Sequence, residues 1–278
     1  MNRKEIVLPK DIVLIIQQIV QDYKKDNHLE EVVKDGIFDL LESKCTVIYY
    51  PFPDEKNRGF YIRKLVKDKL EDFVYINTDK TVEYQVFTAA HELGHIYRVY
   101  NKVCDIAHSQ GVVLDRDDRE YEEKITNRFA AELLMPESMF RKKIKDYADE
   151  LDLKHNPSAV GILKLIAKLM DYFMSSFNAV RKRLFEVGVI DKSSNEKLSH
   201  HKETLGMIID MLKQDDNALI NSKTRVKTIS GLRGFLEEAE KVSTVDKSLI
   251  CKIKADFELE DIDFQDDFII NFSGDSVD

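Results

Sequence analysis

The chain has 278 residues, of which 43% are hydrophobic, and its 42 basic and 51 acidic side chains give a formal net charge of −9. Nine of the acids lie within residues 255–278, which contain no Lys or Arg, so the preceding residues are neutral overall. A neutral body with an acidic end argues against direct nucleic-acid binding, because DNA-binding faces need clustered cations.

Composition excludes several further classes of protein. The three cysteines form no Cys-x-x-Cys pair, which is typical of the reducing cytosol and predicts a cytoplasmic protein. No stretch of about eighteen uncharged residues exists, so the sequence predicts no membrane-spanning segment. With only ten glycines and no glycine-rich phosphate motif, phosphate-cradling folds are poor candidates as well.

The first predicted elements are two amphipathic helices and a small sheet. Apolar side chains recur at helical spacing over residues 11–25 and again over 29–42. Three β-prone runs follow at 46–52, 59–66 and 73–77, separated by turns rich in Pro, Asp and Lys. This pattern predicts a three-stranded antiparallel meander.

Helical periodicity then dominates the chain. A helix predicted over 81–100 is followed by a polar loop up to Asp117 and Asp118, which are suitable N-cap residues for a second long helix that stops at Pro136. Further helices are predicted at 137–151, 158–174, 176–187, 201–214, 230–242 and 245–254, with residues 191–200 as a linker. The predicted fold class is therefore α+β and mostly helical.

These elements divide the chain into three predicted regions. Residues 1–136 hold the N-terminal helices, the sheet and the two long helices, 137–190 form a helical support, and 191–278 form a C-terminal helical region with the acidic end. Residues 165–190 resemble a helix-turn-helix in spacing, with the basic run 181–183 on the second helix. The neutral body favours structural support, or a surface that docks a partner, over DNA contact.

The strongest chemical signal is the pentapeptide His91-Glu92-Leu93-Gly94-His95. Residues four apart share a helix face, so both imidazoles can reach one metal ion while Glu92 can hold and deprotonate a metal-bound water. Zinc suits this chemistry, because imidazole is a good zinc ligand and the ion lowers the pKa of bound water. The spacing predicts a Zn²⁺ site with Glu92 as the catalytic base.

A catalytic zinc usually has three protein ligands, and the pentapeptide supplies two. The residues after it lack the Gly and third His of the longer zinc-binding pattern. The second long helix offers Glu122 and Glu123, and Glu123 shares one helical stripe with Asn127 and Ala130. Asn127 is placed to orient a ligand histidine, while Ala130 and Ala131 are small enough for close helix packing.

Two blocks of sequence resemble the ImmA/IrrE family of metallopeptidases. The first is YQVFTAAHELGH at residues 84–95, and the second, more specific block is EKITNRFAAELLMP at residues 123–136. The resemblance extends over about residues 30–190. It implies a zincin-like metallopeptidase fold in which the two motif helices pack on the small sheet.

The resemblance also implies a function. His91 and His95 are the implied zinc ligands, Glu92 is the implied catalytic base, and Glu123 is the implied third ligand, with adjacent Glu122 as the open alternative. The implied activity is that of a zinc metalloendopeptidase, which cleaves a helix-turn-helix transcriptional repressor and relieves repression in a mobile-element or stress response. The alternative is a zinc-containing interaction protein that sequesters a repressor or antitoxin partner without proteolysis.

Two features remain outside these motifs. His108, in the predicted polar loop, is a candidate to stabilise the oxyanion of a peptide-cleavage reaction, as are Tyr97 and Tyr100, although solvation and packing are the simpler interpretations. The acidic end is interleaved with large apolar residues, and its runs 257–259 and 262–264 alternate as strands do. Packing against the body as an added strand is favoured over a solvated tail or docking of a basic partner.

Overall fold

The computed structural model describes residues 8–54, 56–66, 68–155, 158–216, 220–242 and 244–259. The chain forms two compact units, Met1–Ser230 and Gly231–Asp278. The predicted boundaries after residues 136 and 190 fall within the first unit and stay predictions. Within the described ranges, no helix combines the length and the apolar character needed to cross a membrane.

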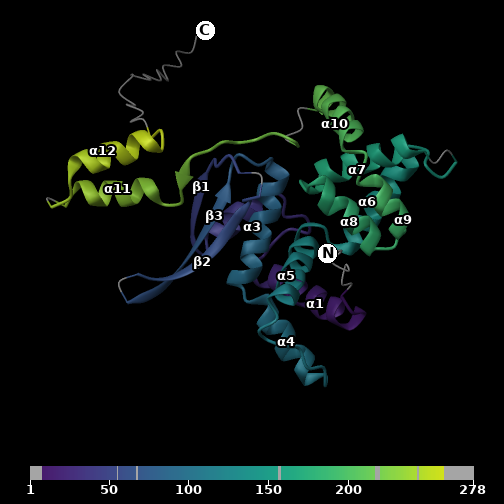
Figure 1. The fold of residues 1–278 in the computed structure, drawn as a ribbon, viewed down its shortest axis with the longest axis horizontal. Coiled ribbons are helices and arrows are strands. Elements are labelled where there is room, and N and C mark those ends of the chain that lie inside the picture. The colour runs from purple at the N-terminus through teal and green to yellow at the C-terminus, as the bar shows by residue number, and fades with distance from the viewer. Residues whose placement is uncertain are drawn as a thin grey trace, which may run out of the picture. The chain divides into compact units, whose positions relative to one another are not determined.

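The first unit is mainly helical and is built around one small sheet (Figure 1). Its N-terminal part contains α1 (Lys10–Asp26), α2 (Gly36–Glu42), β1 (Thr46–Tyr50), β2 (Gly59–Val66) and β3 (Lys69–Asn77). Its middle part contains α3 (Val82–Ile96), α4 (Val99–Ser109), α5 (Arg119–Leu134), α6 (Glu137–Glu150), α7 (Ala159–Phe173) and α8 (Phe177–Glu186). It ends with α9 (Lys192–Leu198), α10 (Lys202–Asp216) and β4 (Thr228–Ile229).

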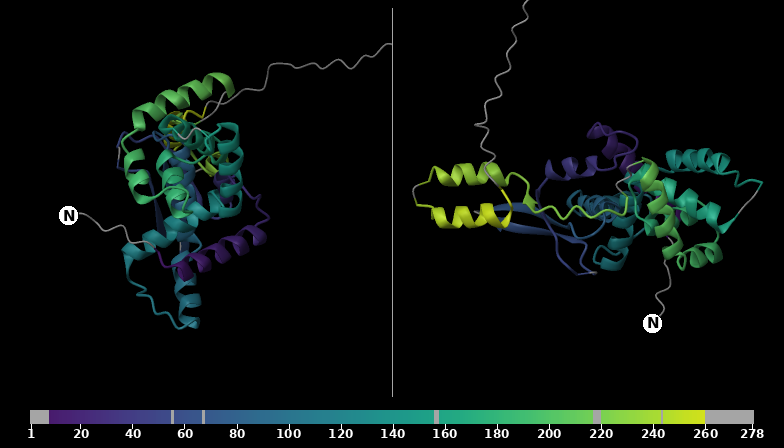
Figure 2. Two further views of the ribbon diagram at one scale, coloured as in Figure 1. Left: turned by 90° about the vertical axis from the view of Figure 1, so that its right-hand side faces the viewer. Right: turned by 90° about the horizontal axis from the view of Figure 1, so that it is seen from above.

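The second unit contains two helices, α11 (Leu232–Glu240) and α12 (Lys247–Asp256), which lie side by side as a hairpin (Figure 2). Of the strand-like runs predicted in the acidic end, 257–259 is wrong. The backbone N–H of Phe257 donates to the carbonyl of Ile253, and the N–H of Leu259 donates to that of Lys254, so this run closes the end of α12. The run 262–264 lies outside the described residues.

The sheet has four strands in the order β2-β3-β1-β4, so the predicted three-stranded antiparallel sheet is wrong in strand number and in one pairing. β2 and β3 form the predicted antiparallel hairpin, but β1 pairs with β3 in parallel, and β4 adds an antiparallel edge beside β1. Both β3 and β1 are interior strands, and the buried residues Val74 and Ile76 of β3 belong to the core. The edge strand β2 instead alternates between partly buried and exposed positions. Alternation predicts which face is buried but not the direction of the neighbouring strand.

Most predicted helices are confirmed, and the differences have local causes. The predicted helix 29–42 is shortened to α2, because His28 and Lys34 adopt positive φ angles that an α-helix does not accommodate. The predicted helix 81–100 is divided at Arg98, which has a φ of 54°. The predicted linker 191–200 is instead α9, because the side chain of Asp191 caps its first turn and Leu198 is buried.

Helix α1 packs across α5 and α4, and its apolar stripe explains why it does so. The side chains of Ile12, Ile16 and Val20 recur at spacings of four and are buried in the core. Tyr23 meets Tyr97 and Phe129 edge-on, with ring centroids 4.5 and 6.0 Å apart. The predicted amphipathic helix is thus confirmed, and its apolar stripe packs against α5 and α4.

A buried ion network joins α5 to α8. The side chain of Arg183 is fully buried, and its Nη2 donates to Glu132 Oε2 at 2.6 Å. Arg128 donates to Glu132 Oε1 at 2.6 Å and to Glu186 at 2.9 Å, and Gln17 of α1 donates to Glu132 at 3.1 Å. Both oxygens of Glu132 are therefore saturated by charge-assisted bonds, which is the condition under which buried charge is tolerated.

Glu132→Ala is expected to lower the free energy of unfolding by about 3–5 kcal/mol, because it leaves the buried Arg183 guanidinium without its main partner. Urea denaturation followed by circular dichroism measures the change. Glu120→Ala is the matched control, since that carboxylate is 60% exposed and pairs with Lys124 in an i,i+4 arrangement. The control is expected to cost less than about 0.5 kcal/mol. Equal losses in the two variants would contradict the assigned role of the network.

Candidate metal centre

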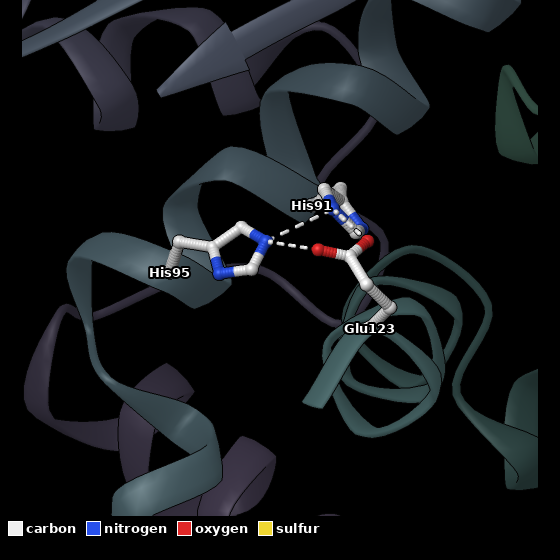
Figure 3. Close-up of side chains that lie close together, drawn as sticks. All are labelled: His91, His95 and Glu123. Atoms are coloured by element: carbon white, nitrogen blue, oxygen red, sulfur yellow. Dashed lines mark hydrogen bonds and ion pairs between the residues drawn. The ribbon is translucent and has the colours of Figure 1, made fainter. Parts of the chain in front are cut away.

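Two neighbouring helices bring the predicted site residues together. Helix α3 runs over the sheet and carries His91 and His95 one turn apart, while α5 begins at its N-cap Asp118, whose side chain accepts a hydrogen bond from the Tyr121 N–H. That cap sets the start of α5 and places Glu123 in its second turn. The two imidazoles and the Glu123 carboxylate point toward one another (Figure 3).

The spacing of these three side chains fits a zinc ion. His91 Nε2 and His95 Nε2 are 3.1 Å apart. Glu123 Oε2 lies 3.3 Å from His91 Nε2, and Glu123 Oε1 lies 3.4 Å from His95 Nε2. Tetrahedral zinc with bonds of about 2.0–2.1 Å separates its ligand atoms by about 3.3–3.4 Å. All three candidate atoms lie within 4.8 Å of one another, so the donor set and the spacing both suit Zn²⁺.

The structure also separates Glu123 from its neighbour. Glu123 faces the Nε2 atoms of both histidines, whereas Glu122 Oε1 lies 3.6 Å from the opposite ring nitrogen, Nδ1, of His95. Glu122 is therefore placed to orient His95, as outer partners of metal-binding histidines commonly do. Asn127, which was predicted to orient a ligand histidine, raises the pKa of His91. Among the described residues the buried Nδ1 of His91 has no hydrogen-bond partner, so the orienting role of Asn127 stays a prediction.

The protonation of the three groups is interdependent. Burial opposes a charge on His91, but a hydrogen bond with Glu123 and the charges of Glu92 and Glu123 raise the pKa of that imidazole. Burial and the neighbouring His91 lower the pKa of His95. The hydrogen bond with His91 lowers the pKa of the Glu123 carboxyl. The Glu123 carboxylate thus favours a positive charge between itself and the two imidazoles. A divalent cation would supply that charge.

Glu92 lies beside this cluster and is only 6% exposed. Burial raises the pKa of its carboxyl to about 7, with His91 acting against the shift and Glu123 adding to it. A carboxylate with a pKa near neutrality is suited to take up and release a proton at physiological pH. Position and pKa therefore both agree with the predicted role of a general base.

The approach of α5 to α3 depends on Gly94. A Cβ atom at this position would lie 2.8 Å from Thr126 Cγ2 and 3.2 Å from Phe129 Cδ1, and both of those residues are buried. On the facing helix, Ala130 and Ala131 are buried, as the predicted close packing of the two helices requires. The glycine of the pentapeptide thus fixes how near Glu123 comes to the histidines.

Tyr61 of β2 was not predicted as part of the site. Its ring stacks on the His95 imidazole, with centroids 6.4 Å apart and planes inclined by 2°. Its hydroxyl donates to Asp72 Oδ1 at 2.7 Å. Arg63 also donates to Asp72, from Nε to Oδ1 and from Nη2 to Oδ2. The alternation of β2 places Tyr61 and Arg63 on one face, but no local motif marks them.

The other residues considered from the sequence lie away from such contacts. His108 is exposed in the last turn of α4 instead of lying in a loop. Tyr97 packs with Tyr23, and the hydroxyl of buried Tyr100 donates to the carbonyl of Asp115, so both tyrosines have structural roles. The basic run of α8 is divided, since Arg183 is buried and Arg181 donates to Asn195.

Helix α3 packs on the small sheet and α5 packs on α3, instead of both motif helices packing on the sheet as the resemblance implied. Together they present two imidazoles and a carboxylate, an arrangement of the metallopeptidase type. The chain belongs to the IrrE N-terminal-like domain family, peptidase family M78, whose family model matches residues 41–185, just over half of its length. The resemblance found in the sequence is thereby confirmed at the level of the family.

Other comparisons are more distant. Among curated proteins, none matches the chain. Among solved structures, a Mycobacterium tuberculosis transcriptional regulator is similar to it with a TM-score of 0.41 and 13% sequence identity. The matched region covers 64% of this chain and 47% of that one, so the chain spans about half the length of the regulator.

Gly94→Ala is expected to push α5 away from α3. The crowding costs about 1–3 kcal/mol and outweighs the gain in helix propensity of about 1 kcal/mol. Denaturation should show a net loss of stability, and zinc titration should show weaker binding. Gly206→Ala in α10 is the matched control, because a Cβ there meets no atom within 4 Å. That variant is expected to be at least as stable as the parent; a gain at both positions would contradict the packing argument.

Glu92→Gln is expected to stabilise the chelator-treated protein, and the gain should depend on pH. The pKa of the folded-state carboxyl, about 7, lies above its ordinary value of 4.5, so native stability falls as pH rises through this window. Glutamine lacks this loss, so the stability of the variant relative to the parent should rise by about 3 kcal/mol between pH 4.5 and pH 8.

Urea denaturation at several pH values measures the difference between Glu92→Gln and the parent. Glu120→Gln, at an exposed carboxylate, is the control, and its difference from the parent should stay within about 0.5 kcal/mol. A pH-independent difference for Glu92→Gln would show that the carboxyl is not desolvated in the folded protein.

Proposed function

We propose that the protein is a zinc-dependent endopeptidase in which His91, His95 and Glu123 hold the metal. The observation that carries this proposal is the convergence of three donor atoms at the spacing of a zinc tetrahedron, next to a buried carboxyl of near-neutral pKa. Membership of a peptidase family supports the same reaction class. Glu123 is preferred to Glu122 as third ligand because it faces both Nε2 atoms.

Zinc, when bound, polarises the scissile carbonyl and lowers the pKa of a coordinated water. The chain's own residues then divide the remaining work. Glu92 accepts a proton from the attacking water and delivers it to the leaving amine. Glu122, at Nδ1 of His95, and Tyr61, stacked on the same ring, keep this imidazole in the orientation that presents Nε2 to the metal.

The proposed substrate is a helix-turn-helix repressor or a similar regulatory protein, whose cleavage would relieve repression. The proposal rests on the family resemblance of the two sequence blocks around the site. A cytoplasmic location follows from such a substrate and from the cysteine usage. Direct binding to nucleic acid is not part of the proposal, since the cations of the run 181–183 are largely engaged within the protein.

The test is incubation of zinc-loaded protein with a helix-turn-helix protein encoded beside its gene, followed by intact-mass analysis. The parent is expected to cut at one bond, and Glu92→Gln to bind zinc equally while cutting at least about a hundredfold more slowly. Zinc retention makes this variant its own control for folding. An intact repressor that both proteins release from DNA would favour sequestration without proteolysis over the proposed reaction.

The same preparations identify the third ligand. Glu123→Ala is expected to weaken zinc binding more than Glu122→Ala does, because removal of an outer partner typically costs about ten- to a hundredfold in affinity and loss of a ligand costs more. Competition with a chelator of known affinity measures both. The reverse order would transfer the ligand role to Glu122.

A further inference from the structure

A large groove adjoins the metal centre and is not used by the chemistry proposed above. It has a volume of about 1130 Å³ and runs between α1, α5 and α8. Phe87, one turn before His91 on α3, and Asn127, one turn after Glu123 on α5, both line it. Small-molecule sites usually measure about 300–1,000 Å³, so this groove has room for a longer segment of chain.

The groove is positively charged in a protein that is negative overall. Its lining includes seven cationic side chains and four carboxylates, whereas the whole chain carries −9. Three of those carboxylates, Glu132, Glu137 and Glu186, are already bound by arginines. The cations outside this arginine network are Lys10, Lys24, Arg58, Lys124 and Lys182.

These cations have fixed or solvent-facing positions along the groove. Lys24 Nζ donates to the carbonyl of Glu31 at 2.6 Å, and the Arg58 guanidinium lies 4.9 Å from the centre of the Tyr84 ring. Lys124 pairs with Glu120, outside the groove, whereas Lys10 and Lys182 are exposed. Charge therefore remains available along the walls for an incoming anionic group.

Apolar side chains alternate with this charge. Leu14 of α1 is 56% exposed and faces the groove, and Phe87 and Phe185 contribute partly buried rings. The floor is rigid, because Arg128 bridges Glu132 of α5 and Glu186 of α8. A nucleic-acid backbone would leave these apolar side chains without a partner, whereas a peptide with mixed acidic and apolar side chains finds a complement for each.

We propose that this groove binds an acidic, partly apolar segment of the protein substrate and presents the adjoining peptide bond to the metal centre. The inference rests on the proposed function, because the groove selects a substrate only if the neighbouring site cleaves one. Lys10 and Lys182, on opposite helices, determine the preference for acidic side chains. They touch no reacting atom and act by binding alone.

The test measures binding separately from cleavage. We use two fluorescein-labelled peptides of about twelve residues. Both contain Leu and Ser, and the remaining positions are Glu in one peptide and Lys in the other. Each peptide is titrated with the full-length chain, and binding is followed by fluorescence anisotropy. The Glu peptide is expected to bind at least about tenfold more tightly than the Lys peptide, and its affinity is expected to fall with salt. Equal affinities would overturn the proposal.

The matched variants carry the same change in net charge. Lys10→Glu/Lys182→Glu reverses two groove cations, while Lys25→Glu/Lys197→Glu reverses two exposed cations that do not line the groove. The first pair is expected to weaken binding of the Glu peptide about tenfold or more, and the second less than about twofold. An equal loss of affinity in both double variants would show that the peptide is attracted by the overall charge of the protein. That result would overturn the proposal of a specific binding groove.

Two further measurements separate the groove from the peptidase. Zinc binding by the groove variant should match that of the parent, which shows that the metal centre is intact. If Glu-peptide binding follows the predicted pattern while no partner is cleaved, the proposed function fails and the groove stands only as a binding site for acidic peptide. If the repressor is cleaved at equal rates by the parent and the groove variant, the groove inference fails alone. A DNA duplex that competes more strongly than the Glu peptide would assign the groove to nucleic acid instead.

Discussion

The contact between α3 and α5 is the constraint on which the site depends. Two of the proposed ligands belong to one helix and the third to the other, so the metal centre exists only where the helices nearly touch. Gly94 and the small side chains of α5 permit that approach, and the sheet beneath α3 and the stripe of α1 against α5 hold the pair from either side. The close packing of α3 on α5 is therefore also what sets the distances between the proposed ligands.

The far end of α5 is held by charge as well as by the apolar packing of residues such as Phe129 and Leu133. Glu132 belongs to the conspicuous second sequence block, yet it faces away from the proposed metal and binds Arg128 and Arg183. Burying these groups is unfavourable by itself and becomes tolerable only when every partner is in place. Such a network allows one arrangement of α1, α5 and α8, and the same residues form the floor of the groove.

Sequence alone predicted those features that local spacing encodes. The helices followed from apolar periodicity, and the placement of His91 and His95 on one face followed from their separation. Glu122 and Glu123 were indistinguishable, because consecutive residues point about 100° apart and the choice depends on how α5 is rotated. The parallel pairing of β1, the strand β4 and the stacking of Tyr61 depend on contacts between distant segments, for which no local pattern exists.

The pairing of β4 with β1 has a consequence for biosynthesis. Ile229 lies opposite Ile48, and Ser230 Oγ accepts a hydrogen bond from the backbone of Val47, so the last strand of the first unit closes the edge left by one of its earliest. While the ribosome has yet to deliver residues 228–230, the emerging chain carries both motif helices but an unpaired β1 edge. The nascent protein would therefore hold its candidate metal ligands before its sheet is complete, and a chaperone or an early zinc ion would meet it in that form.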